Sequence, residues 1–201
     1  MAAPSLPTPS FSRLAALAFA SAVLGASAAQ VDVAGVKLED QMDLRGSPLV
    51  LNGAGIRYKA IFKVYTAGLY LPKKAGTPEE VLSMPGAKSM RVVMLRDIDS
   101  GELGKLFARG MEDNMDKAQF SKLVPGVMRM SQLFSDIKGL KSGEGFTLDW
   151  IPGTGAVVSV KGVPQGEPFK EPEFFNAILR IWLGHAPADW KLKEALLGKQ
   201  G

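Results

Sequence analysis

Alternating apolar and polar positions dominate the first half of the chain and predict β-strands. Residues 31–38 alternate around a central glycine, which is typical of a small hairpin at a sheet edge. Residues 48–71 form the strongest strand region because they are rich in β-branched and aromatic side chains, and Gly53 and Gly55 are expected to mark a bulge or bend. Residues 89–97 are predicted to form another strand.

Helical spacing replaces this alternation near residue 99. Asp99 and Ser100 are expected to begin a helix whose apolar positions run from Leu103 to Ala118. A second helix is predicted over 126–137 because its apolar residues share one face.

Strands return at 146–151 and 156–160, which flank a turn and predict a hairpin. A helix is then expected from Pro172 to a stop at Gly184, followed by a short helix that ends at Leu197. Because strands and helices come in blocks and do not alternate, the pattern predicts an α+β fold, an antiparallel sheet with helices packed on one face.

The N-terminal segment is typical of a secretion signal. Its single charge, Arg13, precedes an apolar run over 14–24 that is too short to span a bilayer, and the small residues Ala26 and Ala28 follow. We expect a cleaved signal peptide at 1–28, a domain at 29–201 in the periplasm or outside the cell, and no stable membrane anchor after cleavage. A retained anchor is the alternative. An amphipathic first helix fits poorly, because the run lacks a polar face.

Composition excludes several kinds of chemistry. The chain has no cysteine, so thiolate catalysis and disulfides are excluded, and its one histidine, His185, cannot build a histidine-based metal site. The net charge is +4, with the basic residues scattered and not clustered, so nucleic acid is not an expected partner. No phosphate loop or Gly-x-Ser-x-Gly motif occurs. We therefore expect neither a metal nor another cofactor.

Arg57 and Tyr65 are polar residues within the strongly apolar strand region. On one straight strand they would lie roughly 26 Å apart at about 3.3 Å per residue and could not share a ligand. If the chain turns near 58–60, adjacent strands would bring them together, and an arginine fork with a phenol would suit an oxyanion or carboxylate. No Gly, Pro or Asn indicates that turn, so the residues alone favour a solvated arginine and a tyrosine at the sheet rim.

Asn114 falls on the apolar helical face that also carries Phe107 and Met111. A polar side chain on such a face must find a hydrogen-bond partner. That partner is either a backbone group, which is the common case, or a bound ligand.

These residues resemble the chalcone isomerase superfamily, specifically its bacterial, exported, chalcone isomerase-like branch. Residues 53–57 and 62–71 resemble the family's Gly-x-Gly-x-Arg motif and the strand after it, and residues 175–184 resemble its late helix. The resemblance covers nearly the whole mature chain. It implies an open-faced β-sandwich, in which a helical layer covers one face of a large antiparallel sheet and a ligand cleft lies between them.

The resemblance also implies roles for individual residues. In chalcone isomerases an Arg holds the developing oxyanion, a Thr and a Tyr position a water, and an Asn and a late Thr or Ser contact the flavonoid. Arg57 and Asn114 match that pattern, whereas Tyr65, Phe107 and Ile181 replace the Thr, the Tyr and the late Thr or Ser. Phe107 has no hydroxyl to orient water, and Ile181 cannot hydrogen-bond a substrate hydroxyl.

The pair of Arg57 and Tyr65 instead resembles fatty-acid-binding members of the superfamily, where these residues hold a carboxylate and the tail enters an apolar cleft. We therefore expect non-catalytic binding of a fatty acid or similar apolar carboxylate, with Asn114 as a secondary contact. The expected ligand-binding residues are Arg57, Tyr65, Phe107, Met111, Asn114 and Ile181.

Two other functions stay open. The first is an isomerase or lyase of the chalcone isomerase type, in which Arg57 is the catalytic residue that stabilises an oxyanion. The second is a structural or interaction domain with a filled cleft and no ligand, in which the methionine and aromatic residues only pack the core. The sequence specifies neither protein partners nor an oligomeric state.

Overall fold

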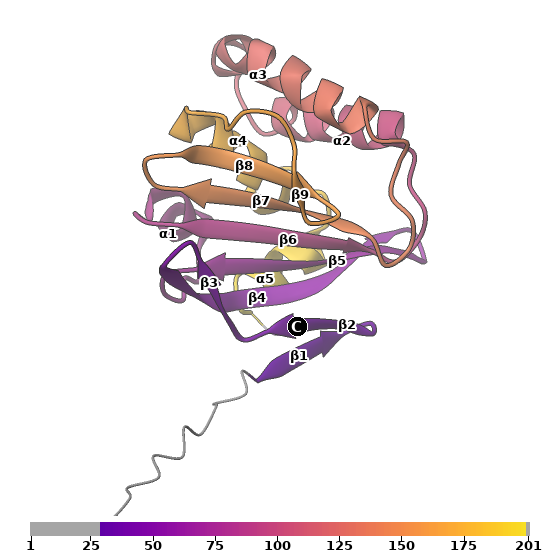
Figure 1. Ribbon diagram of the computed structural model, residues 1–201, viewed down its shortest axis with the longest axis vertical. Helices are drawn as coiled ribbons and strands as arrows, with labels where there is room; N and C mark the ends of the chain where they lie inside the picture. The colour runs from indigo at the N-terminus through magenta and orange to yellow at the C-terminus, as the bar shows by residue number, and fades with distance from the viewer. Residues whose placement is uncertain (1–28, 200–201) are drawn as a thin grey trace, which may run out of the picture.

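The computed structural model describes residues 29–199, so the predicted signal peptide at 1–28 lies outside the described residues (Figure 1). The strands are β1 (Gln30–Val33), β2 (Val36–Glu39), β3 (Gln41–Leu44), β4 (Ser47–Lys59), β5 (Phe62–Leu71), β6 (Lys88–Met94), β7 (Gly145–Ile151), β8 (Gly155–Val160) and β9 (Val163–Pro164). The helices are α1 (Pro78–Ser83), α2 (Ser100–Glu112), α3 (Lys117–Ser135), α4 (Pro172–Leu183) and α5 (Trp190–Leu196). Within the described residues, no helix is long and apolar enough to cross a membrane.

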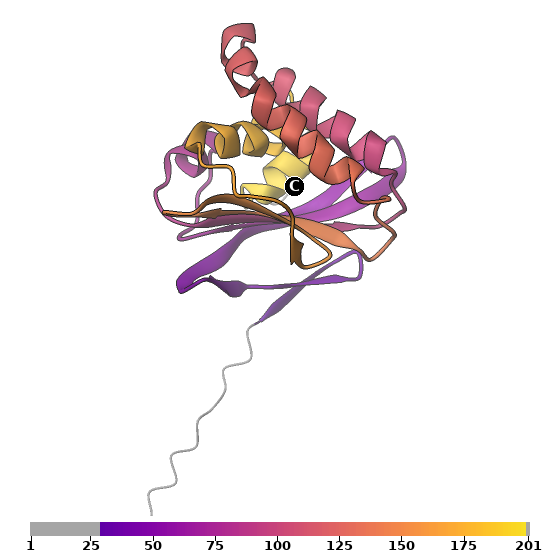
Figure 2. The ribbon, with the colours of Figure 1, turned by 45° about the horizontal axis from the view of Figure 1, so that its top comes forward.

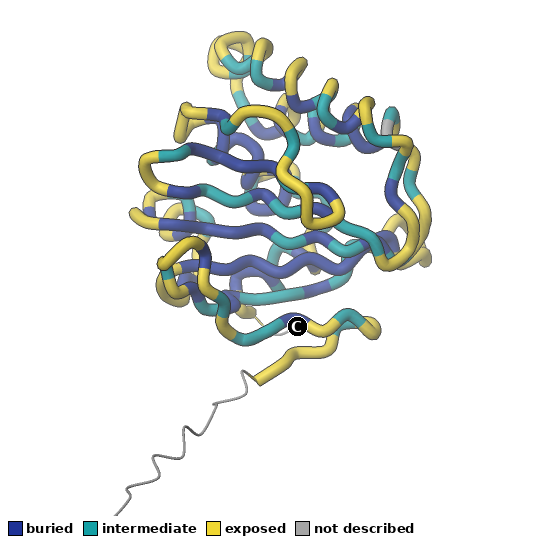
Figure 3. Tube along the Cα trace, viewed as in Figure 1, coloured by how far each residue is buried: buried dark blue, intermediate teal, exposed yellow. Residues whose placement is uncertain are grey.

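One antiparallel sheet forms the centre of the fold, with strand order β3-β4-β5-β6-β7-β8-β9, so each strand pairs with its neighbour in the chain. The helices lie over one face of this sheet, and the β1–β2 hairpin lies under the other (Figure 2). The main core fills the space between sheet and helices, where Met90, Phe134 and Ile178 are fully buried. The central strand β5 is buried from Val64 to Leu71, because helices cover one face of the sheet and the hairpin covers the other, whereas burial comes closer to alternation along β7 (Figure 3). The predicted α+β, open-faced β-sandwich is confirmed.

The predicted hairpin near residues 31–38 is confirmed, but it forms a separate two-stranded sheet of β1 and β2. Two side chains of β5 fasten this hairpin to the large sheet. The Thr66 hydroxyl donates to the Val33 carbonyl over 3.1 Å, and the Tyr70 hydroxyl donates to the Glu39 carbonyl over 2.9 Å. A second, smaller apolar cluster that includes Tyr70 lies on this face of the sheet.

The strong strand region over 48–71 is two antiparallel strands, β4 and β5. A register shift between Leu51 and Gly53 confirms the predicted bulge. The glycines also let α5 approach the sheet. A Cβ on Gly53 would lie 2.0 Å from the Ala195 carbonyl oxygen, and one on Gly55 would lie 2.7 Å from the Ala195 Cβ. Glycine is therefore required here by the helix that packs against β4.

The boundary between the two middle helices differs from the prediction. Asp99 caps α2 as expected, by accepting from the backbone N–H groups of Gly101 and Glu102. The helix ends at Glu112, however, and α3 begins at Lys117, where the Asp116 side chain accepts from the Gln119 N–H. The predictions of a first helix through Ala118 and a second from 126 were therefore wrong. A new cap at Asp116 interrupts the apolar spacing, and α3 continues through Pro125.

Three short elements, α1, β3 and β9, were not predicted. Thr77 and Glu80 nevertheless form a capping box at the start of α1. The two C-terminal helices agree with the prediction, and the N–H of Gly184 closes α4 by donating to the Arg180 carbonyl.

Candidate ligand-binding site

Arg57 and Tyr65 lie directly opposite each other on β4 and β5. The Arg57 Cζ lies 5.6 Å from the centre of the Tyr65 ring. The strands are joined at residues 60 and 61, where Ala60 takes a left-handed φ of 56° without being a glycine. The interpretation of a solvated Arg57 and a Tyr65 at the sheet rim is therefore wrong, because the two side chains lie together and Tyr65 is buried in the main core.

The hydroxyl of Tyr65 has one protein partner among the described residues. Trp182, on α4, donates its indole N–H to the Tyr65 oxygen over 2.8 Å. The hydroxyl proton of Tyr65 thus remains available for another acceptor. Burial raises the Tyr65 pKa to about 12, although the charge of Arg57 and the Trp182 hydrogen bond partly oppose that rise. Tyr65 is therefore a neutral hydrogen-bond donor at physiological pH.

The guanidinium of Arg57 is only lightly engaged by the protein. Its Nε donates a long hydrogen bond of 3.5 Å to the Ala188 carbonyl. Within residues 29–199, no carboxylate lies within ion-pair distance of Arg57, and its terminal nitrogens have no protein acceptor. A partly buried cation beside a phenol donor is an anion site, because both groups offer protons in the same direction.

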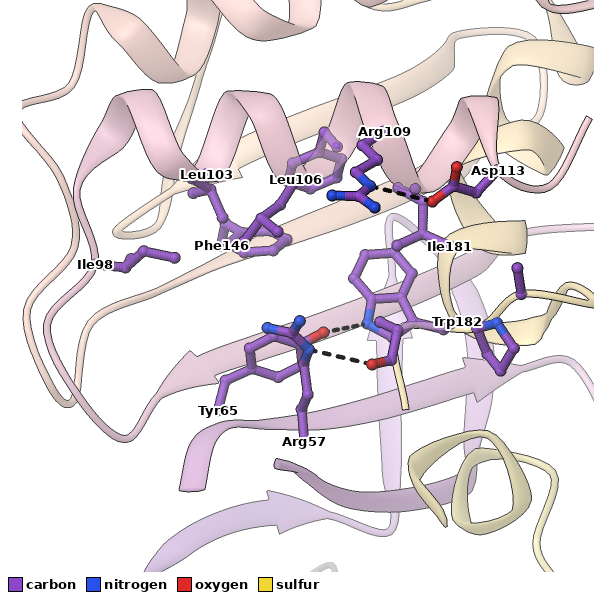
Figure 4. A pocket seen from close by; sticks show the side chains of 15 residues that line it. Arg57, Tyr65, Ile98, Leu103, Leu106, Arg109, Asp113, Phe146, Ile181 and Trp182 are labelled. Atoms are coloured by element: carbon purple, nitrogen blue, oxygen red, sulfur yellow. Dashed lines mark hydrogen bonds and ion pairs between the residues drawn. The ribbon is translucent and has the colours of Figure 1, made fainter. Parts of the chain in front are cut away.

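An apolar cavity of about 260 Å³ begins at this pair and extends under α2 (Figure 4). The strands β4, β5 and β7, the helices α2 and α4 and the loop after α4 supply its walls. Its apolar side chains are Ile98, Leu103, Leu106, Phe107, Phe146, Ile181 and Trp182. On the α2 side lie Arg109 and Asp113, an exposed pair whose Nε and Oδ2 atoms are 3.5 Å apart.

A second, more polar cavity of about 170 Å³ meets the first one. The two share Arg57, Ile98 and Leu106, so Arg57 lies where they join. The second cavity adds two basic side chains, Lys59 and Arg96, and two acidic ones, Asp97 and Glu102. Arg57 therefore borders a polar cavity on one side and an apolar cavity on the other.

Four of the six residues expected at the ligand line the apolar cavity, namely Arg57, Tyr65, Phe107 and Ile181. Met111 is fully buried in the core and does not line it.

Asn114 does not line the cavity either, because backbone groups occupy its amide. It donates to the carbonyls of Gly110 and Ala186 over 2.8 and 2.9 Å, and it accepts from the Ala186 N–H over 2.8 Å. Of the two partners considered for Asn114, the structure shows the backbone. The side chain positions the loop at 186–188, which forms one wall of the cavity.

Several parts of the site had no signal in the sequence. The acceptor for the Arg57 side chain is the backbone carbonyl of Ala188, which any residue at that position would supply. The role of Trp182 as the donor to Tyr65 depends on the packing of α4 against β5. No group of three or more His, Asp or Glu residues within the described part of the chain could hold a metal ion.

Comparisons with known proteins support this fold. A search for relatives among curated proteins finds no significant match. Among solved structures, the chain is similar to a fatty-acid binding protein of Arabidopsis thaliana, with a TM-score of 0.64 and 18% sequence identity over 81% of this chain and 92% of that one. The profile of the chalcone isomerase-like family matches residues 30–198. The chain therefore belongs to the chalcone isomerase-like family.

Proposed function

We propose that this protein binds a fatty acid or a similar apolar carboxylate in the cavity between sheet and helices, without catalysing a reaction. The observation that carries the proposal is the guanidinium edge of Arg57, which pairs with no carboxylate of residues 29–199, beside the Tyr65 hydroxyl at one end of an apolar cavity. The similar plant protein is described as a fatty-acid binding protein, which supports the same ligand class.

The two polar groups have complementary tasks. The terminal nitrogens of Arg57 can hold both oxygens of a carboxylate in a forked, charge-assisted pair. The Tyr65 hydroxyl, which already accepts from Trp182, donates its proton to one of those oxygens. The hydrocarbon tail then displaces water from the apolar side chains beyond. A cavity of about 260 Å³ lies near the lower end of the usual size of ligand pockets, roughly 300 Å³, which favours a short or medium chain.

Binding fits these residues better than isomerisation. Arg57 alone could stabilise an oxyanion, but an isomerase also needs groups that position water and read substrate hydroxyls. Phe107 and Ile181 offer neither, and both line the cavity. The pKa of Tyr65, raised by burial to about 12, also keeps this phenol from acting as a base near neutral pH.

We also propose that the protein is exported, as in the bacterial branch that the sequence resembles, and acts in the periplasm or outside the cell after removal of residues 1–28. The apolar run behind Arg13 and the small residues after it support this proposal. N-terminal sequencing of the protein from cell fractions is the test. A new terminus near residue 29 in the exported fraction is expected, and an intact start in the cytoplasm would contradict export.

The binding proposal is tested by extracting purified protein for lipid analysis and by titrating fatty acids of different lengths. Arg57→Ala removes the charged fork and is expected to weaken binding about tenfold to a hundredfold. Arg57→Lys keeps the positive charge but not the forked geometry, so its affinity for a fatty acid should lie between those of the wild type and Arg57→Ala. Arg109→Ala is the matched control, because Arg109 also borders the cavity but is already paired with Asp113.

Each variant should first be shown to unfold near the wild-type temperature. Equal affinities of wild type and Arg57→Ala would contradict the carboxylate clamp. Chalcone cyclisation by the wild type, well above the uncatalysed rate and lost in Arg57→Ala, would support the isomerase instead.

A further inference from the structure

The turn between β4 and β5 carries large apolar side chains in solvent. Ile61 is 84% exposed and Phe62 is 58% exposed, and the neighbouring Tyr58 is also exposed. These residues lie at and beside the turn that joins β4 to β5, and none of them belongs to either apolar core cluster. Exposed aromatic and aliphatic residues gathered in one place mark a surface that meets another apolar phase.

Basic side chains surround this tip. Lys59 and Lys63 flank it along the chain, and the Arg96 guanidinium lies 5.8 Å from the centre of the Phe62 ring. Two carboxylates lie nearby, but they are engaged. Glu102 is 3.7 Å from Lys59, and Asp97 is 2.8 Å from Lys141. The tip therefore combines apolar side chains with a surplus of positive charge.

The tip is also continuous with the ligand-binding site. The smaller, polar cavity is bordered by Lys59 and Arg96 and reaches Arg57, where the apolar cavity begins. Asp97 and Glu102 also line this cavity, but each is paired with a lysine, so the Arg96 guanidinium is left to attract a carboxylate on its way to Arg57. The positions of Ile61 and Phe62 thus place this polar cavity next to whatever surface they contact.

We propose that residues 58–63, together with Arg96, form a membrane-docking tip that inserts Ile61 and Phe62 into the interface of an anionic bilayer. Apolar side chains beside Lys and Arg are the chemistry that such an interface recognises. Docking itself does not require a fatty acid. Its use for transfer of a ligand between bilayer and cavity rests on the proposed function.

A bilayer suits the shape of this tip better than a protein partner does. Stable protein interfaces bury on the order of 1,000 Å² or more of well-fitted surface, whereas this tip projects only a few side chains. A bilayer needs no shape match, and each basic residue near an anionic surface changes partitioning about fivefold.

The test is co-sedimentation of the full mature protein with vesicles of phosphatidylcholine alone and with added phosphatidylglycerol. We expect binding to the anionic vesicles, weakened at high salt because the attraction is electrostatic. Ile61→Ser with Phe62→Ser should weaken it at least about tenfold. Lys63→Glu should weaken it about fivefold or more, because it removes one positive charge and adds a negative one.

Met128→Ser is the matched control, since Met128 is 68% exposed but lies on α3. Its binding should equal that of the wild type. Absent binding by the wild type, or equal loss in the control and the tip variant, would overturn the proposal. Self-association that depends on Ile61 and Phe62 without vesicle binding would identify a second copy of the chain as the partner and would also overturn it. Arg57→Ala should still bind vesicles, so failure of docking is distinguishable from failure of fatty-acid binding.

Discussion

The indole nitrogen of Trp182 and the hydroxyl oxygen of Tyr65 lie 2.8 Å apart, and their hydrogen bond joins α4 to β5 inside the core. An indole can only donate, so the phenol oxygen must accept and keeps its own proton for a third group. Arg57 lies opposite Tyr65 on the neighbouring strand and points a cation at the same place. A contact between helix and sheet thus orients one of the two donors of the ligand site.

Tyr65→Phe should destabilise the protein, because it leaves the buried Trp182 N–H without an acceptor. The expected cost at pH 8 is about 1–3 kcal/mol in the free energy of unfolding, measured by urea titration. Because Tyr65 is also one of the two donors to the ligand, the same variant should bind fatty acids more weakly.

The pH dependence of this effect has a defined sign. Burial raises the Tyr65 pKa to about 12 in the folded state, against 10.0 when unfolded. The contribution of the neutral phenol is fully present below pH 10, and it falls as the pH rises toward 12, because the unfolded state loses the proton first. The stability gap between wild type and Tyr65→Phe should therefore narrow by up to about 2.7 kcal/mol over that range. A constant gap from pH 9 to 11.5 would contradict the raised pKa.

Asn114→Ala tests whether this residue holds the loop or the ligand. It removes three hydrogen bonds to backbone groups, two of them to Ala186, so we expect a loss of about 2–4 kcal/mol in stability. Asn114→Asp keeps the acceptor for the Ala186 N–H but turns a buried carboxylate toward the carbonyls of Gly110 and Ala186, so it should destabilise the protein at least as much. Affinity for a fatty acid, measured well below the melting temperature, should change less than in Arg57→Ala. A large loss of affinity with unchanged stability would instead support the direct ligand contact expected from the sequence.

Gly184→Ala should be strongly destabilising for a steric reason. A Cβ there would lie 2.0 Å from the Asn114 Oδ1 and 2.6 Å from the Arg180 carbonyl oxygen. The φ of Gly184 is −73°, which suits any residue, so the cost comes from overpacking and not from backbone strain. We expect about 1–3 kcal/mol, seen as a lower melting temperature. Gly104→Ala in α2 is the control. Its nearest neighbour would be at 3.5 Å, and alanine should be neutral or stabilising there.

Phe107→Leu should enlarge the cavity. The Phe107 ring stacks on Phe134 at 4.8 Å and meets Trp182 edge-on at 6.1 Å, and the side chain also lines the cavity. Truncation to leucine should cost about 1–2 kcal/mol and leave a folded protein with more space beside the tail. In titrations with a series of fatty acids, the preferred chain length should increase. An unchanged preference would mean that the tail does not pass Phe107.

Several features followed from the sequence alone, because they depend on local physics. Alternation with a period of two and β-branched residues predicted the strands. The succession of strands and helices in blocks predicted the α+β class. Asp99 as a cap and Gly184 as a stop were readable because capping acts on neighbouring backbone groups. The motif at 53–57 gave the family resemblance. Its glycines also gave the bulge, although their reason, the approach of α5, is a tertiary contact.

The assembly of the site was decided by tertiary structure. Whether Arg57 meets Tyr65 depended on a turn at Ala60 that carries no turn residue, and pairing along the whole of β4 and β5 stabilises that turn. Asn114 lay on an expected helical face, yet its partner Ala186 is 72 residues away. The sequence thus determined which residue types were available for a carboxylate site. Long-range packing decided which of them face the cavity, because strand register and helix docking join groups whose separation along the chain carries no local signal.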